Sequence, residues 1–170
     1  GEWLGAHAVP AKLAKEEVTV VRSVTGARMV CAPAVSPRRF GDETMALGDG
    51  LLEATDMGPV AGPQQYQDIR SAICRAQADG ARMITGGDAN VPADGYFIRP
   101  TVFAGVRPEM EIFREEIFGP VLAVSEFESL DEALAMANNS IYGLSSAIYT
   151  SDLRAAKRYI DGIEAGLAHV

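Results

Sequence analysis

The sequence has little of what defines several large classes of protein. It contains two cysteines, Cys31 and Cys74, too few for a disulfide framework or a cysteine-rich zinc site. No apolar run approaches the length of a membrane span, and the N-terminus lacks the basic-then-apolar pattern of a signal peptide. Acidic residues outnumber basic ones by 23 to 15, which gives a formal net charge of −8. We therefore expect a cytoplasmic protein that binds neither nucleic acid nor membranes, and we assign it no metal site.

The composition of the 170 residues is that of a folded protein, with 48 % hydrophobic and 22 % charged residues. Short apolar runs at residues 18–21 and 29–32 suit strands. From Pro63 onward helical and strand patterns alternate, with strands expected at 82–85, 121–124, 145–149 and 167–170. Short connections between such elements predict an α/β fold, a parallel-sheet domain of three layers.

Local signals mark the helices of this pattern. Pro63 and Gly80 are expected to begin and end the first, and Ser129 and Ser151 to cap the later two. Apolar residues at helical spacing should face the core: Tyr66, Ile69, Ile73 and Ala76 in the first helix, and Leu153, Ala156, Ile160 and Ile163 in the last. Cys74, next to Ile73, is interpreted as a packing residue.

A charged segment precedes the apolar run at 121–124. Glu115 and Glu116 are adjacent and cannot both point inward without desolvating like charges together. Phe118 offers an apolar face, and Gly119 permits a close approach of neighbouring groups. Taken alone, these residues favour a solvated acidic turn over the rim of a binding site. The rest of the chain decides between the two.

Five motifs, in order, resemble the catalytic domain of NAD(P)-dependent aldehyde dehydrogenases. They are TDMGP at residues 55–59, AQADGAR at 76–82, GYFIRPTV at 95–102, EEIFGPV at 115–121 and NSIYGLS at 139–145. One such motif would be a weak signal, whereas five in the family's order and near its spacing are a strong one.

The resemblance gives the charged segment a role. It implies that Glu116, the second glutamate, hydrogen-bonds the ribose next to the nicotinamide of NAD or NADP. It implies that Phe118 packs beside the nicotinamide end of the cofactor. A carboxylate can accept two hydroxyl bonds, and an aromatic rim keeps water away from a hydride path. Glu115 is expected to turn to solvent or to a local basic partner.

The resemblance also implies a cysteine nucleophile that forms a thiohemiacetal with an aldehyde, which is then oxidised to a carboxylic acid. Cys31 is the candidate, because it precedes Glu116 in the family's order. Its surroundings, TGARMVCAP at residues 25–33, depart from the family's Gly-Gln-x-Cys turn. The alternative is that Cys31 is a buried small side chain.

Two parts are expected on this basis: a divergent or truncated N-terminal segment at residues 1–47, and a partial aldehyde dehydrogenase catalytic domain at 48–170. The resemblance implies an enzyme of this type, present as a fragment that is inactive alone, and full-length relatives that form homo-oligomers. The alternative is a non-catalytic folded remnant or an interaction module. Which aldehyde is oxidised, and whether NAD or NADP serves, are not specified by these residues.

Overall fold

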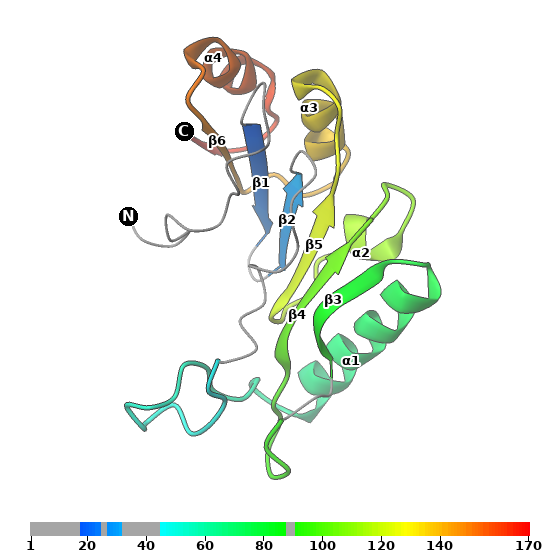
Figure 1. The fold of residues 1–170 in the computed structure, drawn as a ribbon, viewed down its shortest axis with the longest axis vertical. Coiled ribbons are helices and arrows are strands. Elements are labelled where there is room, and N and C mark those ends of the chain that lie inside the picture. The colour runs from blue at the N-terminus through cyan, green and yellow to red at the C-terminus, as the bar shows by residue number, and fades with distance from the viewer. Residues whose placement is uncertain (1–17, 25–26, 32–44, 88–90) are drawn as a thin grey trace.

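The computed structural model describes residues 18–24, 27–31, 45–87 and 91–170, the first two ranges by their backbone (Figure 1). The elements are β1 (Val18–Val24), β2 (Ala27–Cys31), α1 (Pro63–Ala78), β3 (Arg82–Gly87), β4 (Arg99–Ala104), α2 (Glu111–Arg114), β5 (Val121–Ser125), α3 (Leu130–Asn138), β6 (Ser145–Thr150), α4 (Leu153–Gly162) and β7 (Leu167–His169). The expected strands and the three expected helices are therefore present. α2, which no periodicity announced, was missed.

One seven-stranded sheet runs through the molecule in the order β3-β4-β5-β2-β1-β6-β7. β5 is parallel to both β2 and β4, and β6 is parallel to β7. The pairs β1–β2, β1–β6 and β3–β4 are antiparallel, so the sheet is mixed. The α/β class, with parallel strands, is confirmed, whereas the antiparallel pairs that β1 and β3 make were not predicted. Residues before position 48 supply β1 and β2, which lie in the middle of this sheet.

The helix ends follow local chemistry in two of three cases. Pro63 is the first residue of α1, and Gly80 adopts a φ of 93° just after it, a left-handed conformation that favours glycine. Ser129 Oγ accepts a hydrogen bond from the Glu132 N–H at the start of α3. For α4 the prediction of Ser151 was wrong, because Asp152 is the N-cap and accepts from the Arg154 N–H.

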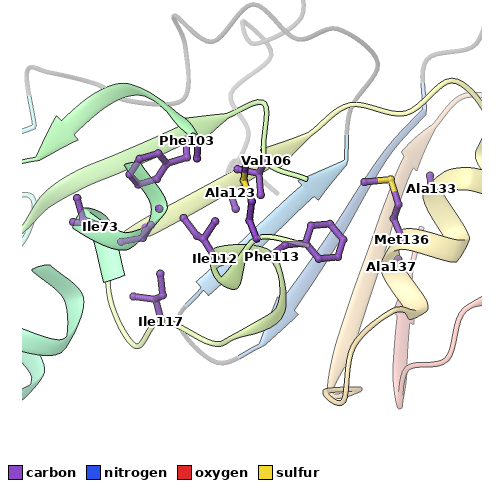
Figure 2. Packing of buried hydrophobic residues seen from close by; sticks show 14 of the residues in the cluster. Ile73, Phe103, Val106, Ile112, Phe113, Ile117, Ala123, Ala133, Met136 and Ala137 are labelled. Atoms are coloured by element: carbon purple, nitrogen blue, oxygen red, sulfur yellow. The ribbon is translucent and has the colours of Figure 1, made fainter. Parts of the chain in front are cut away.

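The core joins residues from all four helices to the strands. Figure 2 shows Ile73 of α1, Ile112 of α2 and Phe103 of β4 within this cluster of buried apolar side chains. Ile69 is 1 % exposed and Phe103 is fully buried. In Figure 1, α1 lies beside β3 at one end of the sheet and α4 beside β6 toward the other. The cluster therefore connects the two ends of the sheet.

Two predictions about buried faces were wrong. Of the four residues expected to face the core in the last helix, Ala156 is buried and Ile163 is half-buried, whereas Leu153 is 83 % and Ile160 is 52 % exposed. α4 buries Ala155 and Tyr159 in their place. Its buried face is rotated relative to the predicted one because the Tyr159 hydroxyl donates to Ser146 Oγ inside the core. Cys74 is an exposed free cysteine, since Ile73 takes the inward position.

None of the helices in the described part of the chain combines the length and apolar character that a membrane span requires.

Candidate cofactor-binding site

A cavity of about 420 Å³ lies between α1 and the segment that runs from α2 to the start of β5. Its lining comes from residues 64–75 on one side and 111–118 on the other. The second group contains Glu116 and Phe118, the two cofactor residues expected from the sequence. Segments that are distant in sequence therefore converge here, as they do at most ligand sites.

α1 presents a mixed face to the cavity. Ile69 and Ala72 contribute apolar surface, while Gln64, Gln65 and Asp68 contribute polar groups. Ile69 is anchored in the core, so this helix face cannot rotate away without exposing it. The cavity wall on this side is therefore held by the packing of α1 itself.

α2 is joined to α1 by a two-point ion pair. Arg75 Nε and Nη2 each donate to a different carboxylate oxygen of Glu111, both at 2.8 Å. This hydrogen bonding raises the pKa of Arg75 above its ordinary value, so the guanidinium stays charged. The pair is half exposed, and its contribution to stability is small, but its fork geometry defines how the two helices face each other.

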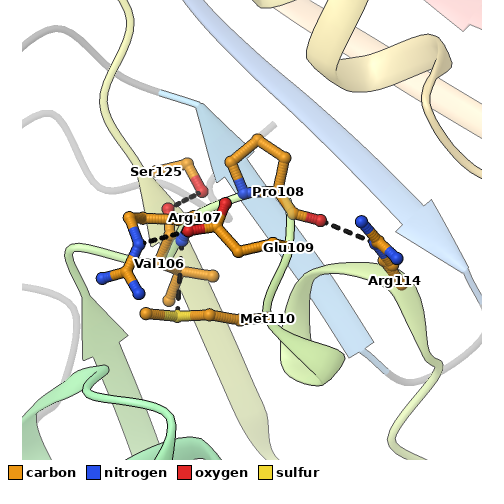
Figure 3. Close-up of polar contacts among 7 residues, drawn as sticks. All are labelled: Val106, Arg107, Pro108, Glu109, Met110, Arg114 and Ser125. Atoms are coloured by element: carbon orange, nitrogen blue, oxygen red, sulfur yellow. Dashed lines mark hydrogen bonds and ion pairs between the residues drawn. The ribbon is translucent and has the colours of Figure 1, made fainter.

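The turn that leads into α2 is held by its own contacts (Figure 3). Arg114 Nε donates to the carbonyl of Pro108 at 2.7 Å, which folds the end of α2 back on this turn. Ser125 Oγ, fully buried at the end of β5, donates to the carbonyl of Val106 at 2.7 Å. Both ends of the segment 106–125 are thereby tied together, and the cavity-lining part between them has fixed anchors.

The segment after α2, residues 115–120, alternates in exposure. Glu115 is exposed and Glu116 is half-buried at the cavity wall. Ile117 is buried in the core, and the Phe118 side chain is 58 % exposed. The adjacent glutamates thus differ in exposure, as expected: both line the cavity, but Glu115 is exposed to solvent, whereas Glu116 is half-buried in the wall.

Gly119 makes a close contact that a larger residue could not make. A methyl group added there would lie 2.5 Å from Ile69 Cδ1 and 2.7 Å from Cγ1, distances that real carbon atoms do not tolerate. The glycine thus lets the segment 115–120 sit directly on α1.

The electrostatics of the lining are acidic. Asp68, Glu111, Glu115 and Glu116 face a single arginine, Arg75, which is paired with Glu111. Such a lining suits hydroxyl groups and cations and disfavours phosphates. Within the described residues, no group of three His, Cys, Asp or Glu side chains is arranged to hold a metal ion.

Cys31 ends β2, and its backbone pairs with Ser125, the last residue of β5. Glu116 and Phe118 precede Val121, the first residue of β5. Because β2 and β5 are parallel, the backbone of Cys31 lies at the opposite end of β5 from the cavity. The structure thus brings Glu116 and Phe118 together and does not bring the Cys31 backbone to them.

Sequence reasoning missed Gln65 as part of this site. Its side chain bonds the backbone of Phe118, a residue 53 positions away. No local pattern around Gln65 announces a contact at that separation. The missed α2 likewise has only four residues, too few to show a helical period.

The mixed sheet with its helices and the cavity before β5 define an α/β protein with a candidate small-molecule site. Comparison with known proteins defines its family. The model of the aldehyde dehydrogenase family matches residues 39–170, and the chain belongs to this family. The resemblance inferred from the five motifs is confirmed.

Similar proteins include a betaine aldehyde dehydrogenase from Agrobacterium fabrum, 47 % identical over 126 residues, which are 73 % of this chain and 26 % of that protein. A mutant of aldehyde dehydrogenase C from Pseudomonas syringae, in complex with NAD⁺ and octanal, has a similar structure, with a TM-score of 0.70 and 39 % identity. That match covers 74 % of this chain and 26 % of the other. Betaine aldehyde dehydrogenase from Staphylococcus aureus, in complex with NAD⁺, matches with a TM-score of 0.70, 37 % identity, and coverage of 74 % and 25 %. The chain thus spans about a quarter of the length of these relatives.

Proposed function

We propose that this chain supplies one wall of the cofactor site of an NAD(P)-dependent aldehyde dehydrogenase. In this proposal Glu116 accepts hydrogen bonds from the ribose next to the nicotinamide, and Phe118 packs beside the ring. The observation that supports it is the position of both residues on the wall of one cavity, inside the segment that matches the family. Residues 48–170 are then part of the catalytic domain, and residues 1–47 a divergent segment that contributes strands to it.

The chemistry of the lining agrees with this half of the cofactor. Ribose hydroxyls are donors, and the half-buried Glu116 carboxylate provides the acceptors. The oxidised nicotinamide ring is cationic and flat, which suits an acidic cavity with an exposed aromatic residue at its rim. The pyrophosphate would be repelled by four carboxylates, so we assign its binding to residues outside this lining.

The reaction we propose is the oxidation of an aldehyde to a carboxylic acid. A cysteine thiolate attacks the carbonyl carbon and forms a thiohemiacetal; when bound, NAD(P) accepts the hydride that leaves this carbon. Water then cleaves the resulting thioester and restores the thiol. Phe118, at the rim of the cavity, would exclude water from the hydride path. Cys31 is the candidate nucleophile that the sequence offers; the position of its backbone at the opposite end of β5 from the cavity opposes this role, and substitution tests it.

Betaine aldehyde and NAD⁺ are the first reactants to test, because they occur in the names of the relatives above. We propose a cytoplasmic location, which the low cysteine content supports, and homo-oligomers for the full-length protein.

A chimera tests the proposal against a non-catalytic remnant. The matching 126-residue segment of the Agrobacterium betaine aldehyde dehydrogenase is replaced by that of this chain. An intact cofactor wall predicts NADH formation from betaine aldehyde, measured by absorbance. A folded chimera with no activity would favour the remnant. The 170-residue chain alone is expected to form no NADH.

Two substitutions in the chimera sharpen the test. Glu116→Gln removes a charged acceptor and should lower kcat/KM for NAD⁺ by about tenfold or more. Glu115→Gln, on the exposed neighbour, removes the same charge from the same lining and is the matched control; it should change kcat/KM much less than Glu116→Gln does. Equal effects of the two would contradict the assignment of Glu116.

Cys31→Ala decides the nucleophile. It is made in a second chimera that extends the replacement to include Cys31, with the relative's own catalytic segment removed. If Cys31 is the nucleophile, this variant should lose all NADH formation while still binding NAD⁺. Activity that survives Cys31→Ala would assign Cys31 to the structure of β2 instead.

A further inference from the structure

The side-chain amide of Gln65 makes two hydrogen bonds to two different parts of the backbone. Its Oε1 accepts from the Ala61 N–H at 3.0 Å, and its Nε2 donates to the Phe118 carbonyl at 2.6 Å. Donor and acceptor are therefore both used, and the amide lies between the start of α1 and residues 115–120.

The acceptor bond has an ordinary structural purpose. Ala61 comes just before Gly62, the N-cap of α1, which has no side chain that could cap the helix. A Gln at this place in the first turn can reach back to the N–H groups that precede a helix. The Oε1 bond thus stabilises the start of α1 and does not involve residues 115–120.

The donor bond concerns the cavity. In the run from Ile117 to Pro120 every carbonyl accepts a hydrogen bond. The Ile117 carbonyl accepts from the Gly119 N–H, and the Gly119 carbonyl accepts from the Val121 N–H. The Pro120 carbonyl accepts from the Thr101 N–H. The Phe118 carbonyl accepts a hydrogen bond from Gln65 Nε2, which links the segment to α1 by a polar contact.

A second contact lies one helical turn further on. Ile69 follows Gln65 by four positions and therefore faces the same side of α1. It packs against Gly119, where no side chain could fit. α1 thus holds residues 115–120 at two points, a hydrogen bond at Phe118 and a close apolar contact at Gly119.

We propose that Gln65 is the positioning residue of the cofactor wall. Its amide holds the backbone at Phe118, and thereby the Phe118 ring and the neighbouring Glu116 carboxylate, at a fixed distance from α1. The inference rests on the proposed function for its role in catalysis, but the positioning itself needs no cofactor.

Two substitutions separate the two bonds. Gln65→Glu keeps an oxygen acceptor for the Ala61 N–H and has no proton to donate to Phe118 at neutral pH. A carboxylate in the first turn is also favourable to the helix. Gln65→Met has nearly the same length and loses both bonds. Gln67→Glu, on the exposed side of α1, controls for the added charge.

Amide hydrogen exchange of the 170-residue chain measures separately the protection of Ala61 and that of the backbone around Phe118. In Gln65→Glu the amides of Gly119 and Val121 should exchange about fivefold faster, while that of Ala61 keeps its protection. In Gln65→Met all three should exchange faster, and in Gln67→Glu none should change. Wild-type exchange at Gly119 and Val121 in Gln65→Glu would overturn the inference. So would equal acceleration along the whole of α1, which would mark a purely structural role.

The chimera adds a kinetic measurement. Gln65→Glu should raise KM for NAD⁺ several-fold while the melting temperature stays that of Gln67→Glu. A chimera that is inactive with Gln65 intact would contradict the proposed function and leave the exchange result to decide the positioning. Unchanged KM in an active chimera would overturn the catalytic part of the inference.

Discussion

Among the described residues, two concavities of similar size differ in almost everything else. The cavity at α1 measures about 420 Å³, and a groove beside α4, lined by Leu134, Arg154, Lys157, Arg158, Asp161 and Gly162, measures about 460 Å³. The first has an apolar floor and acidic groups from two distant segments. The second is lined by the charged side of one helix and a single leucine of α3. Volume alone therefore does not distinguish a binding site.

The difference lies in how the charges are used. In the groove, Lys157 pairs with Asp161 and Arg158 pairs with Asp131, which leaves little for a ligand. In the cavity, the arginine is paired with Glu111, and the half-buried Glu116 lies on a wall that Ile69 and Ile117 also line. Convergence of separate elements on a rigid apolar floor is what makes the cavity the better candidate.

The largest effect should come from adding a side chain where the segment 115–120 packs directly on α1. Gly119→Ala forces a methyl group against Ile69, which is 1 % exposed and packed in the core, and should cost about 1–3 kcal/mol of unfolding free energy. Urea denaturation measures it. Gly50→Ala, where nothing lies within 4 Å of the added carbon, is the control.

A second substitution shows whether the cost arises at this contact. Ile69→Val removes Cδ1, the atom that lies nearest the added methyl group. The double variant should therefore lose less stability than the sum of the two single variants. Simple additivity would place the strain elsewhere and weaken the distinction between cavity and groove.

A smaller effect is expected where α4 is anchored. Tyr159→Phe removes the buried hydrogen bond to Ser146 and should lower the unfolding free energy by about 1 kcal/mol. Tyr149→Phe, at a ring that is 52 % exposed, should change nothing measurable in the same thermal melts. Equal effects would mean that α4 is not oriented by Tyr159, and that its charged groove could rearrange.

The smallest effect concerns the groove charges. The hydrogen bond from Arg158 lowers the pKa of Asp131, so the pair stabilises the fold above the ordinary pKa of an aspartate and loses this contribution as pH falls through the lowered value. Arg158→Gln should return the pKa of Asp131 to its ordinary value in an NMR titration. Lys157→Gln should leave it unchanged. Retention of the lowered pKa without Arg158 would show a different source of stabilisation.

Much of this molecule was predictable because its signals are local. Pro63, Gly80 and Ser129 mark helix ends through their own backbone or side-chain chemistry. The buried face of α1 follows from helical spacing. The five motifs led to the family, and the different exposure of Glu115 and Glu116 agrees with the role that the family suggested.

What could not be predicted depends on partners far away in the chain. The buried face of α4 is decided by Tyr159 and its bond to Ser146 on β6, although Leu153 and Ile160 are the more apolar residues. The exposure of Cys74 is a different case, because the helical spacing that places Ile73 in the core already turns its neighbour away from it. The outcome for α4 is not encoded in the periodicity of the helix itself.

The sequence by itself determined the order of the elements other than α2, the ends of α1, the N-cap of α3 and the family, because these depend on residues within a few positions of one another. Only the tertiary structure decided the strand order, the cavity, and the bond that links Gln65 to Phe118 across 53 residues. Such contacts exist only once the core has packed, since the core determines which distant segments lie side by side.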